Sequence, residues 1–251
     1  ILRINSDVPD DAAGDIDMTN LQAFTTVEYE GAREDVHQLD NLVNGGTVKL
    51  TGVDANGTIA VTIKDAAVAG HNTDTLNIVL NAAHAGATTN SDYGALTAAN
   101  IETINITSGT SKAATLTLTT ADNELDLVAL NARTINIDGS VDLDLDGDAL
   151  EDAVEVIDAS ALTGELELSI LGANSGVGVT GSAVEVNTII ASANADVIIG
   201  GAKSDDITTS GGSDIITGGG KSDTFTMTSA ATGGTAVEVV TIKDMTLGAV
   251  A

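Results

Sequence analysis

The chain has 251 residues, with 37 acidic and 9 basic side chains and a formal net charge of −28. Nucleic acid and anionic membrane surfaces are poor partners for such a chain, because both are bound through clustered Lys and Arg. The absence of cysteine excludes disulfide bonds and thiolate chemistry.

The remaining composition is typical of a thin all-β protein. Hydrophobic residues make up 43% of the chain and aromatic residues only 2%, so the core must be built from small aliphatic side chains, as in a solenoid. No apolar run reaches the roughly 18 residues of a membrane-spanning helix. The chain starts at Ile1 without a signal peptide, which predicts a processed product or part of a longer protein.

Residues 1–45 are expected to form a mixed, mainly β region. We predict a strand around Phe24–Tyr29 and a helical turn around Ala32–Val43, ended by the pair Gly45-Gly46. From Thr47 onward, β-branched residues or Leu recur at every second position, which is typical of strands. The expected strands lie at 47–52, 58–65, 74–81, 100–108, 114–120, 124–130, 133–147, 153–160, 164–170 and 182–190.

Five short segments resemble degenerate copies of one structural rung. They are NIETINI at 100–106, NARTINI at 131–137, AVEVIDA at 153–159, AVEVNTI at 183–189 and AVEVVTI at 236–242. Their spacing is irregular, but the shared pattern favours stacked strands. We predict a right-handed parallel β-helix or β-roll solenoid over residues 96–228. The alternative is a β-sandwich whose strands merely share a composition.

These patterns divide the chain into four parts. Residues 1–95 form the N-terminal, mainly β region, and 96–190 form a solenoid with degenerate rungs. Residues 191–228 form a more regular roll, and 229–251 supply one or more closing strands.

The regular roll is defined by four aspartates, each nine residues after the last. They are Asp196, Asp205, Asp214 and Asp223, and each is followed two residues later by Ile198, Ile207, Ile216 or Phe225. This register predicts half-turns of a six-residue loop and a three-residue strand, with 18 residues per full turn. The apolar side chains then point inward, and the aspartates lie on outer loops. Asp196 stacks on Asp214 along one edge, and Asp205 on Asp223 along the other.

Stacked aspartates imply a bound cation. Parallel strands lie about 4.8 Å apart, and two carboxylates at about 5 Å repel by about 3 kcal/mol at an effective dielectric near 20. A calcium ion between them turns this repulsion into ligation, with main-chain carbonyl groups completing a shell of six to eight oxygens. Glycine favours such loops, because it adopts left-handed backbone angles that turn the carbonyl groups inward.

The segment 191–226 resembles the RTX (repeats-in-toxin) β-roll, whose repeat is G-G-x-G-x-D-x-U-x with a large apolar residue at U. The resemblance implies Ca²⁺ ligation by Asp196, Asp205, Asp214 and Asp223, and by main-chain carbonyl groups of Gly200, Gly218 and Gly220. The fourth position is glycine only in the third repeat, at Gly212. In the other three repeats it is Asn194, Lys203 and Lys221. Lys203 and Lys221 could neutralise Asp205 and Asp223 directly, so a metal-free roll is the alternative.

The acidic run at 142–152 is a second candidate calcium site. It begins like an EF-hand loop, but the required Glu at position twelve is replaced by Ala153. A turn cluster that includes Asp146 and Asp148 remains a candidate, and a solvated acidic edge is the alternative. The three histidines lack zinc-binding spacing, and no protease, lipase or nucleotide motif is complete. We therefore do not expect an enzyme.

A second resemblance extends over much of residues 45–228. The segments GGTVKLTG, DTLNIVLN and ANIETINITSG, followed by the short repeat run, are similar to the RTX-bearing surface-layer proteins of Gram-negative bacteria. The resemblance implies type I secretion, an extracellular location and calcium-dependent self-association into a cell-surface lattice. Cell-surface polysaccharide is a further expected partner. An RTX adhesin, an extracellular filament subunit and an accessory domain of a secreted enzyme are the alternatives.

Overall fold

The computed structural model describes residues 1–4, 15–30, 36–53, 57–68, 73–81, 89–110, 121–145, 150, 153–228 and 239–245. Apart from one short 3-10 helix, η1 (Met18–Asn20), its regular elements are strands. The strands are β1 (Leu2–Ile4), β2 (Ile16–Asp17), β3 (Thr26–Tyr29), β4 (Val36–Leu42), β5 (Gly46–Leu50), β6 (Thr58–Ile63), β7 (Thr75–Leu80), β8 (Ser91–Ala99), β9 (Thr103–Ser108), β10 (Asn123–Val128), β11 (Thr134–Gly139), β12 (Leu143–Leu145), β13 (Val156–Leu162), β14 (Leu166–Ser169), β15 (Gly178–Thr180), β16 (Asn187–Ile190), β17 (Val197–Gly201), β18 (Asp206–Thr209), β19 (Ile215–Gly219), β20 (Thr224–Met227) and β21 (Thr241–Ile242).

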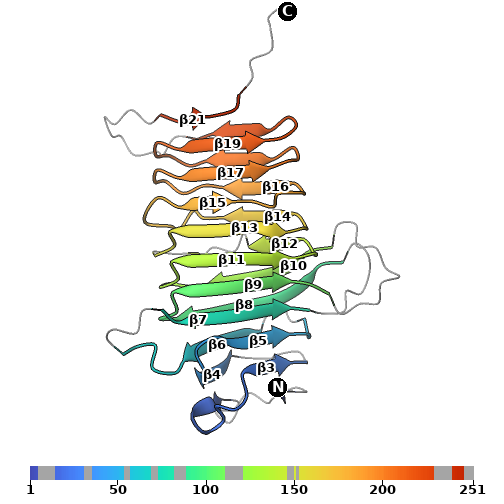
Figure 1. Cartoon of the computed structure of the whole chain (residues 1–251), viewed down its shortest axis with the longest axis vertical. Helices are drawn as coiled ribbons and strands as arrows, with labels where there is room; N and C mark the ends of the chain where they lie inside the picture. Colours follow the sequence, from blue (N-terminus) through green and yellow to red (C-terminus); the bar gives the residue numbers. More distant parts are fainter. Residues whose placement is uncertain are drawn as a thin grey trace, which may run out of the picture.

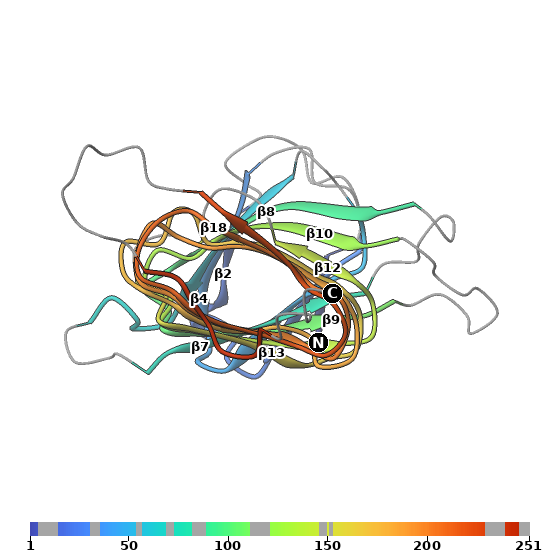
Figure 2. The same ribbon diagram turned by 90° about the horizontal axis from the view of Figure 1, so that it is seen from above.

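The strands form two long parallel sheets that face each other. The odd-numbered strands make an 11-stranded sheet and the even-numbered strands a 10-stranded sheet, each in chain order. The chain therefore alternates between the sheets and climbs one rung with every pair of strands. Figure 1 shows the resulting column, and Figure 2 shows its flattened cross-section. This confirms the predicted parallel β-solenoid and excludes the β-sandwich alternative.

Rung length explains why the repeats looked irregular in the sequence. In the last rungs Val197 lies opposite Ile215 (215 − 197 = 18 residues), and Asp206 lies opposite Thr224 (224 − 206 = 18 residues). Earlier rungs carry longer turns, and Thr103 lies opposite Thr134 (134 − 103 = 31 residues). Three of the five rung-like segments contribute to β9, β11 and β13, which are neighbours in one sheet.

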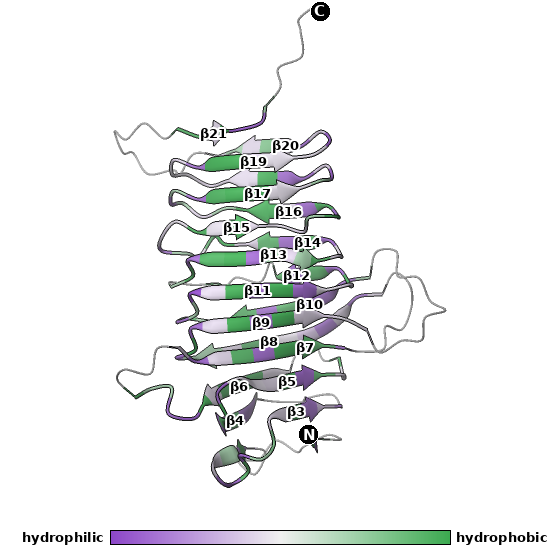
Figure 3. Cartoon of the chain, in the orientation of Figure 1, coloured by the Kyte–Doolittle hydropathy of each residue, from purple (hydrophilic) through white to green (hydrophobic). Residues whose placement is uncertain are grey.

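The core lies between the two sheets and is built from alternate residues of each strand. Side chains of successive strand residues point to opposite faces, so every second residue enters the core. Ile198, Ile207 and Ile216 are buried as predicted, whereas Phe225 near the end of the column is only half-buried. Figure 3 shows how apolar and polar residues alternate along the strands.

The N-terminal region belongs to the same solenoid. The predicted strand at 24–29 is confirmed as β3, but the helical turn predicted at 32–43 is wrong where the structure describes it. Residues 36–42 form β4, which pairs with β2 and β6. Pairing with both neighbours favours a strand over the local helical pattern. The sequence also failed to predict β8 and β15, and the expected strand at 114–120 lies outside the described residues.

Both sheets run through the predicted domain boundaries. The boundary at 95/96 falls inside β8, and the boundary at 190/191 falls at the end of β16. Strands on either side of each boundary are paired, since β8 bonds to β10 and β16 to β18. The repeat-bearing rungs are therefore supported directly by the rungs that precede them.

Candidate metal centre

The four period-nine aspartates occupy equivalent positions, each immediately before a strand. Asp196 precedes β17 and Asp214 precedes β19 in one sheet, while Asp205 and Asp223 precede β18 and β20 in the other. The main-chain N–H of Asp196 donates to Asp214 Oδ1 (2.9 Å). In the same way, Asp205 N–H donates to Asp223 Oδ1 (3.1 Å). The predicted pairing of the aspartates along two separate edges is therefore confirmed.

The aspartates are largely buried although they lie in turns. The exposed fractions of Asp196, Asp205 and Asp214 are 1%, 0% and 0%, and Asp223 is partly buried. The reason is that each carboxylate folds back onto main-chain N–H groups of the preceding rung. These donors need partners because they are buried in the turns. The aspartates therefore lie in the turns, as predicted, but their carboxylates point back against the preceding rung.

Asp196 is satisfied by hydrogen bonds on both of its oxygens. Its Oδ1 accepts from Val177 N (2.8 Å), and its Oδ2 accepts from Ser192 N (2.9 Å) and Ser192 Oγ (2.9 Å). Burial raises the pKa of Asp196, while the N–H groups of Val177 and Ser192 and the Ser192 hydroxyl lower it. This carboxylate therefore has little remaining capacity for a metal ion in the described conformation.

Asp205 is different, because one of its oxygens has no partner. Asn187 donates to Asp205 Oδ1 through its main-chain N (2.7 Å) and its side-chain Nδ2 (2.8 Å). Oδ2 is buried, and no group meets it in hydrogen-bond geometry. Burial raises the pKa of Asp205, the side-chain and main-chain N–H groups of Asn187 lower it, the charge of Asp223 raises it, and the Gly201 main-chain N–H lowers it.

Two glycines allow oxygen atoms of neighbouring rungs to approach the main chain closely beside this free oxygen. A Cβ at Gly200 would lie 2.5 Å from Asp205 Oδ2 and 2.5 Å from the carbonyl oxygen of Gly218. A Cβ at Gly218 would lie 2.1 Å from Asp223 Oδ2, one rung further on. A carboxylate oxygen and a carbonyl oxygen thus both lie close to Gly200, where only glycine can be accommodated. We name Asp205, Gly200 and Gly218 the oxygen cradle; its donors fit a hard cation such as Ca²⁺.

The predicted role of the glycines needs a correction. Left-handed backbone angles occur at Gly211, Gly212 and Gly219 in this region, but not at Gly200, Gly218 or Gly220. The last three glycines are required by close approach instead. For example, a Cβ at Gly220 would lie 2.7 Å from the carbonyl oxygen of Ala202 on the rung below. The rungs are stacked too closely there to accommodate a side chain.

The two lysines of the repeat do not occupy the oxygen cradle. Lys203 Nζ lies 3.4 Å from Glu185 Oε2, in an ion pair whose side chains are both about half exposed. Lys221 is exposed and has a left-handed backbone with φ of 70°. The alternative in which Lys203 neutralises Asp205 is therefore wrong, because Lys203 instead pairs with an acid outside the repeat.

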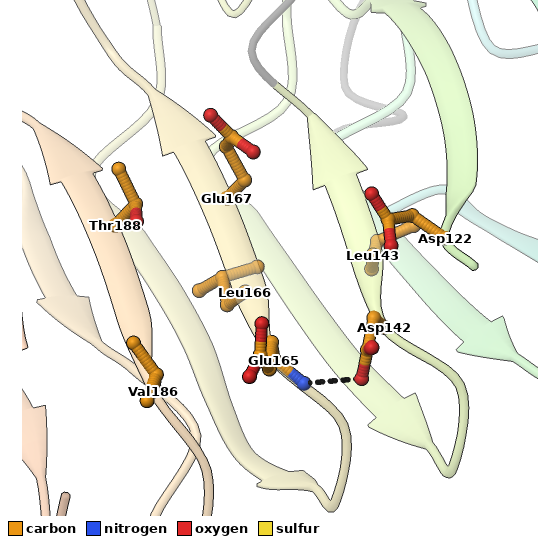
Figure 4. Close-up of a pocket in the computed structure, with 8 residues that line it drawn as sticks. All are labelled: Asp122, Asp142, Leu143, Glu165, Leu166, Glu167, Val186 and Thr188. Atoms are coloured by element: carbon orange, nitrogen blue, oxygen red, sulfur yellow. Dashed lines mark hydrogen bonds between the residues drawn. The ribbon is translucent and has the colours of Figure 1, made fainter. Parts of the chain in front are cut away.

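The second predicted site is only partly within the described region. Asp146 and Asp148 lie outside it, whereas residues 143–145 form β12 with Leu143 and Leu145 buried, which is incompatible with an EF-hand loop. Asp122, Asp142, Glu165 and Glu167 line a hollow of about 50 Å³. Figure 4 shows them side by side, with Glu165 N donating to Asp142 Oδ1 (2.7 Å). No three Asp, Glu or His residues in the described segments form a metal-binding group.

Three polar residues around the aspartates were missed in the sequence. Asn187, Ser182 and Ser192 are buried, and Asn187 links Asp205 to the Ser182 main chain, with Ser182 N donating to Asn187 Oδ1 (2.6 Å). Asn187 and Ser182 belong to the degenerate rung before the repeat, which the nine-residue pattern does not reach, whereas Ser192 lies within the first repeat at a position where the pattern has glycine. The only signal in the sequence was that each is a polar residue next to a predicted turn, where a side chain can bond to the main chain.

Without calcium, we expect the protein to become less stable as pH rises from about 4 to 7. Burial raises the pKa of Asp142, Glu165, Asp196 and Asp205 above the ordinary values of 3.8 for Asp and 4.5 for Glu. The folded state therefore keeps these protons to higher pH than the unfolded state, and their stabilising effect is lost as pH rises through the folded values. Urea unfolding in chelator at a series of pH values measures this slope.

The Asp142→Asn variant should flatten that slope, because it removes one of the raised groups. The Asp206→Asn variant changes an exposed carboxyl and should not. Hydrogen bonds lower the pKa of Asp17, Glu28 and Asp158, which acts in the opposite direction mainly below about pH 4. Stability that increases steadily from pH 4 to 7 would show that the buried carboxyls do not dominate.

Comparison of the chain with protein-family models, with curated proteins and with solved structures found no match. Within the described segments, no helix has the length and apolar character needed to span a membrane. The proposed function is therefore based on the sequence and the structure of the chain alone.

Proposed function

We propose that this chain is a structural subunit of a calcium-dependent extracellular layer that assembles on the bacterial cell surface. The observation that carries the proposal is the oxygen cradle, in which the buried Asp205 Oδ2 lacks a hydrogen-bond partner and lies, with the Gly218 carbonyl oxygen, close to Gly200. Calcium bound there would neutralise buried charge in a chain of net charge −28.

The outer face of the repeat-bearing rungs supports self-association. Val197, Ile199 and Ile215 are exposed on β17 and β19, and Val197 lies directly opposite Ile215. Exposed apolar residues that adjoin one another often mark contact surfaces. In so acidic a chain, an uncharged face is where two copies meet with the least repulsion.

A filament subunit is the second candidate, and one observation favours it. Among the described residues, β20 pairs only with β18 and is the last strand of its sheet. An unpaired strand edge is a template for adding a strand from another chain. End-to-end stacking of columns would produce filaments, whereas contacts through the outer faces would produce sheets.

Electron microscopy of the purified chain distinguishes these outcomes. In millimolar calcium we expect ordered two-dimensional arrays, which should disperse in chelator. The Val197→Lys variant should weaken the arrays, because it places charge in the apolar face, while Thr208→Lys on the opposite sheet serves as its control. Long unbranched filaments would favour the second candidate. Monomers at high concentration in calcium would rule out both forms of assembly.

A further inference from the structure

A polar ladder runs along the outer face of the 11-stranded sheet, three rungs before the repeat begins. Thr75, Thr103 and Thr134 lie opposite one another on β7, β9 and β11, and the same is true of Asn77, Asn105 and Asn136. Figure 1 shows these strands stacked directly above one another. The chain thus presents hydroxyl and amide groups at the spacing of parallel strands, about 4.8 Å.

The three amides are fixed by hydrogen bonds along the stack. Asn136 Nδ2 donates to Asn105 Oδ1 (2.8 Å), and Asn105 Nδ2 donates to Asn77 Oδ1 (2.8 Å). Asn77 Nδ2 donates to the carbonyl oxygen of Gly45 (2.8 Å). A side-chain amide has two N–H donors and two acceptor lone pairs, so Asn105 and Asn136 each keep one N–H donor beyond these bonds, whereas Asn77 Nδ2 also donates to the carbonyl oxygen of Gly46 (3.3 Å). At the end of the ladder, no described group donates to Asn136 Oδ1.

A β-bulge opens a hollow where the ladder ends. Asn136 lies opposite Asp158, but Asp138 lies opposite Ala161, so β13 carries one extra residue. A bulge of this kind bends the strand and redirects its side chains. The bulge is held by Ser160 N, which donates to Asp158 Oδ1 (3.0 Å).

The hollow has a volume of about 350 Å³, within the roughly 300–1,000 Å³ typical of small-molecule sites. Its polar lining includes Asn105, Thr107, Asn136, Asp138, Asp158 and Ser160. Amide and hydroxyl donors therefore stand beside two carboxylate acceptors on a rigid sheet. Vicinal hydroxyl groups of a sugar ring both donate and accept, so they can satisfy both kinds of partner at once.

We propose that this hollow, bounded by Asn105, Asn136, Asp138 and Asp158, is a binding site for neutral carbohydrate. Anionic ligands are disfavoured by the two carboxylates and by the net charge of −28. A cationic ligand would pair with the carboxylates but leave the amide and hydroxyl donors unused. The hollow shares no residue with the oxygen cradle, and β15 lies between β13 and β17 in the sheet, so we expect binding in the hollow to be independent of calcium.

Protonation does not remove the Asp158 acceptor at neutral pH. The Ser160 hydroxyl and, after it, the Ser160 main-chain N–H lower the pKa of Asp158, and partial burial opposes them. Asp158 therefore stays ionised, and hydrogen bonds to an ionised acceptor are the stronger kind.

The test is to titrate the whole chain with neutral hexasaccharides of β-1,4-linked glucose, N-acetylglucosamine and mannose. Binding is measured by calorimetry and ligand-observed NMR. We expect at least one of them to bind, in calcium and in chelator alike. The Asp138→Ala and Asn136→Ala variants should each weaken binding by about tenfold or more, the effect of losing one hydrogen bond to a charged or fixed group. Asp206→Ala, an exposed carboxylate on the other sheet, should bind like the wild type.

A sulfated hexasaccharide and hexalysine are titrated in the same way, to test whether the hollow binds an anionic or a cationic ligand instead. Unfolding midpoints of all variants confirm that the sheet is intact. Failure of every neutral hexasaccharide to bind at millimolar concentration would overturn the proposal. So would equal binding by the Asp138→Ala variant, or hexalysine binding that is lost in Asp138→Ala, which would assign the hollow to basic peptides. None of these results would bear on calcium binding at the oxygen cradle.

Discussion

Millimolar calcium is expected to raise the free energy of unfolding by about 2.7 kcal/mol when its concentration is a hundred times Kd. The gain would follow from the proposed calcium site, because Asp205 Oδ2 and the Gly218 carbonyl oxygen are brought close to Gly200 only in the folded chain. Chelation should reverse it and speed hydrogen exchange first in β16–β20, the rungs around the cradle. Urea unfolding and hydrogen exchange, each with and without calcium, measure the two effects.

Two neighbouring aspartates supply the matched comparison. Asp205→Asn removes the negative charge but keeps an oxygen that can accept from Asn187, so the fold should survive while the calcium effect shrinks. Asp206→Asn changes the adjacent exposed side chain and should respond to calcium like the wild type. Identical unfolding curves in calcium and in chelator would contradict the expectation for the wild-type chain.

The largest effect of a single substitution is expected for Gly219→Ala. Gly219 has φ of +104°, and a Cβ there would lie 1.8 Å from the carbonyl oxygen of Gly201. The same carbonyl oxygen accepts from Gly220 N (2.9 Å), so the clash would break a contact between rungs. Left-handed strain of about 1–2 kcal/mol and overpacking of about 1–3 kcal/mol together predict a loss near 3 kcal/mol or more.

Gly45→Ala separates these two causes. Gly45 also has a positive φ, of +75°, but a Cβ added there would meet nothing within 4 Å. Its cost should therefore be the strain alone, about 1–2 kcal/mol. Denaturant unfolding of both variants gives the comparison, and equal losses would show that rung spacing at Gly219 relaxes freely.

The solenoid was predictable because its periodicity is local. Alternation in segments such as 58–65 and 74–81 identified strands without any knowledge of their partners, and the two became β6 and β7. The segment 36–42 shows the limit of this approach. Its strand, β4, is defined by pairing with β2 and β6, and pairing between distant residues leaves little local signal.

The candidate site was predictable in register but not in detail. Nine-residue spacing placed Asp196 with Asp214 and Asp205 with Asp223, as the structure has them. It could not reveal that Ser192 and Val177 occupy both oxygens of Asp196, because Val177 comes from the rung before the repeat and the repeat pattern gives no role to a serine at the position of Ser192. For the same reason, nothing in the sequence favoured the edge that contains Lys203, although that edge carries the free oxygen of Asp205.

Calcium binding measured by equilibrium dialysis tests the central claim most directly, using the wild-type chain, Asp205→Asn and Asp196→Asn. If calcium occupies the oxygen cradle, Asp205→Asn should lose a bound ion or at least tenfold in affinity, while Asp196→Asn should lose less, because its oxygens already accept hydrogen bonds. Wild-type stoichiometry and affinity in Asp205→Asn would contradict the assignment.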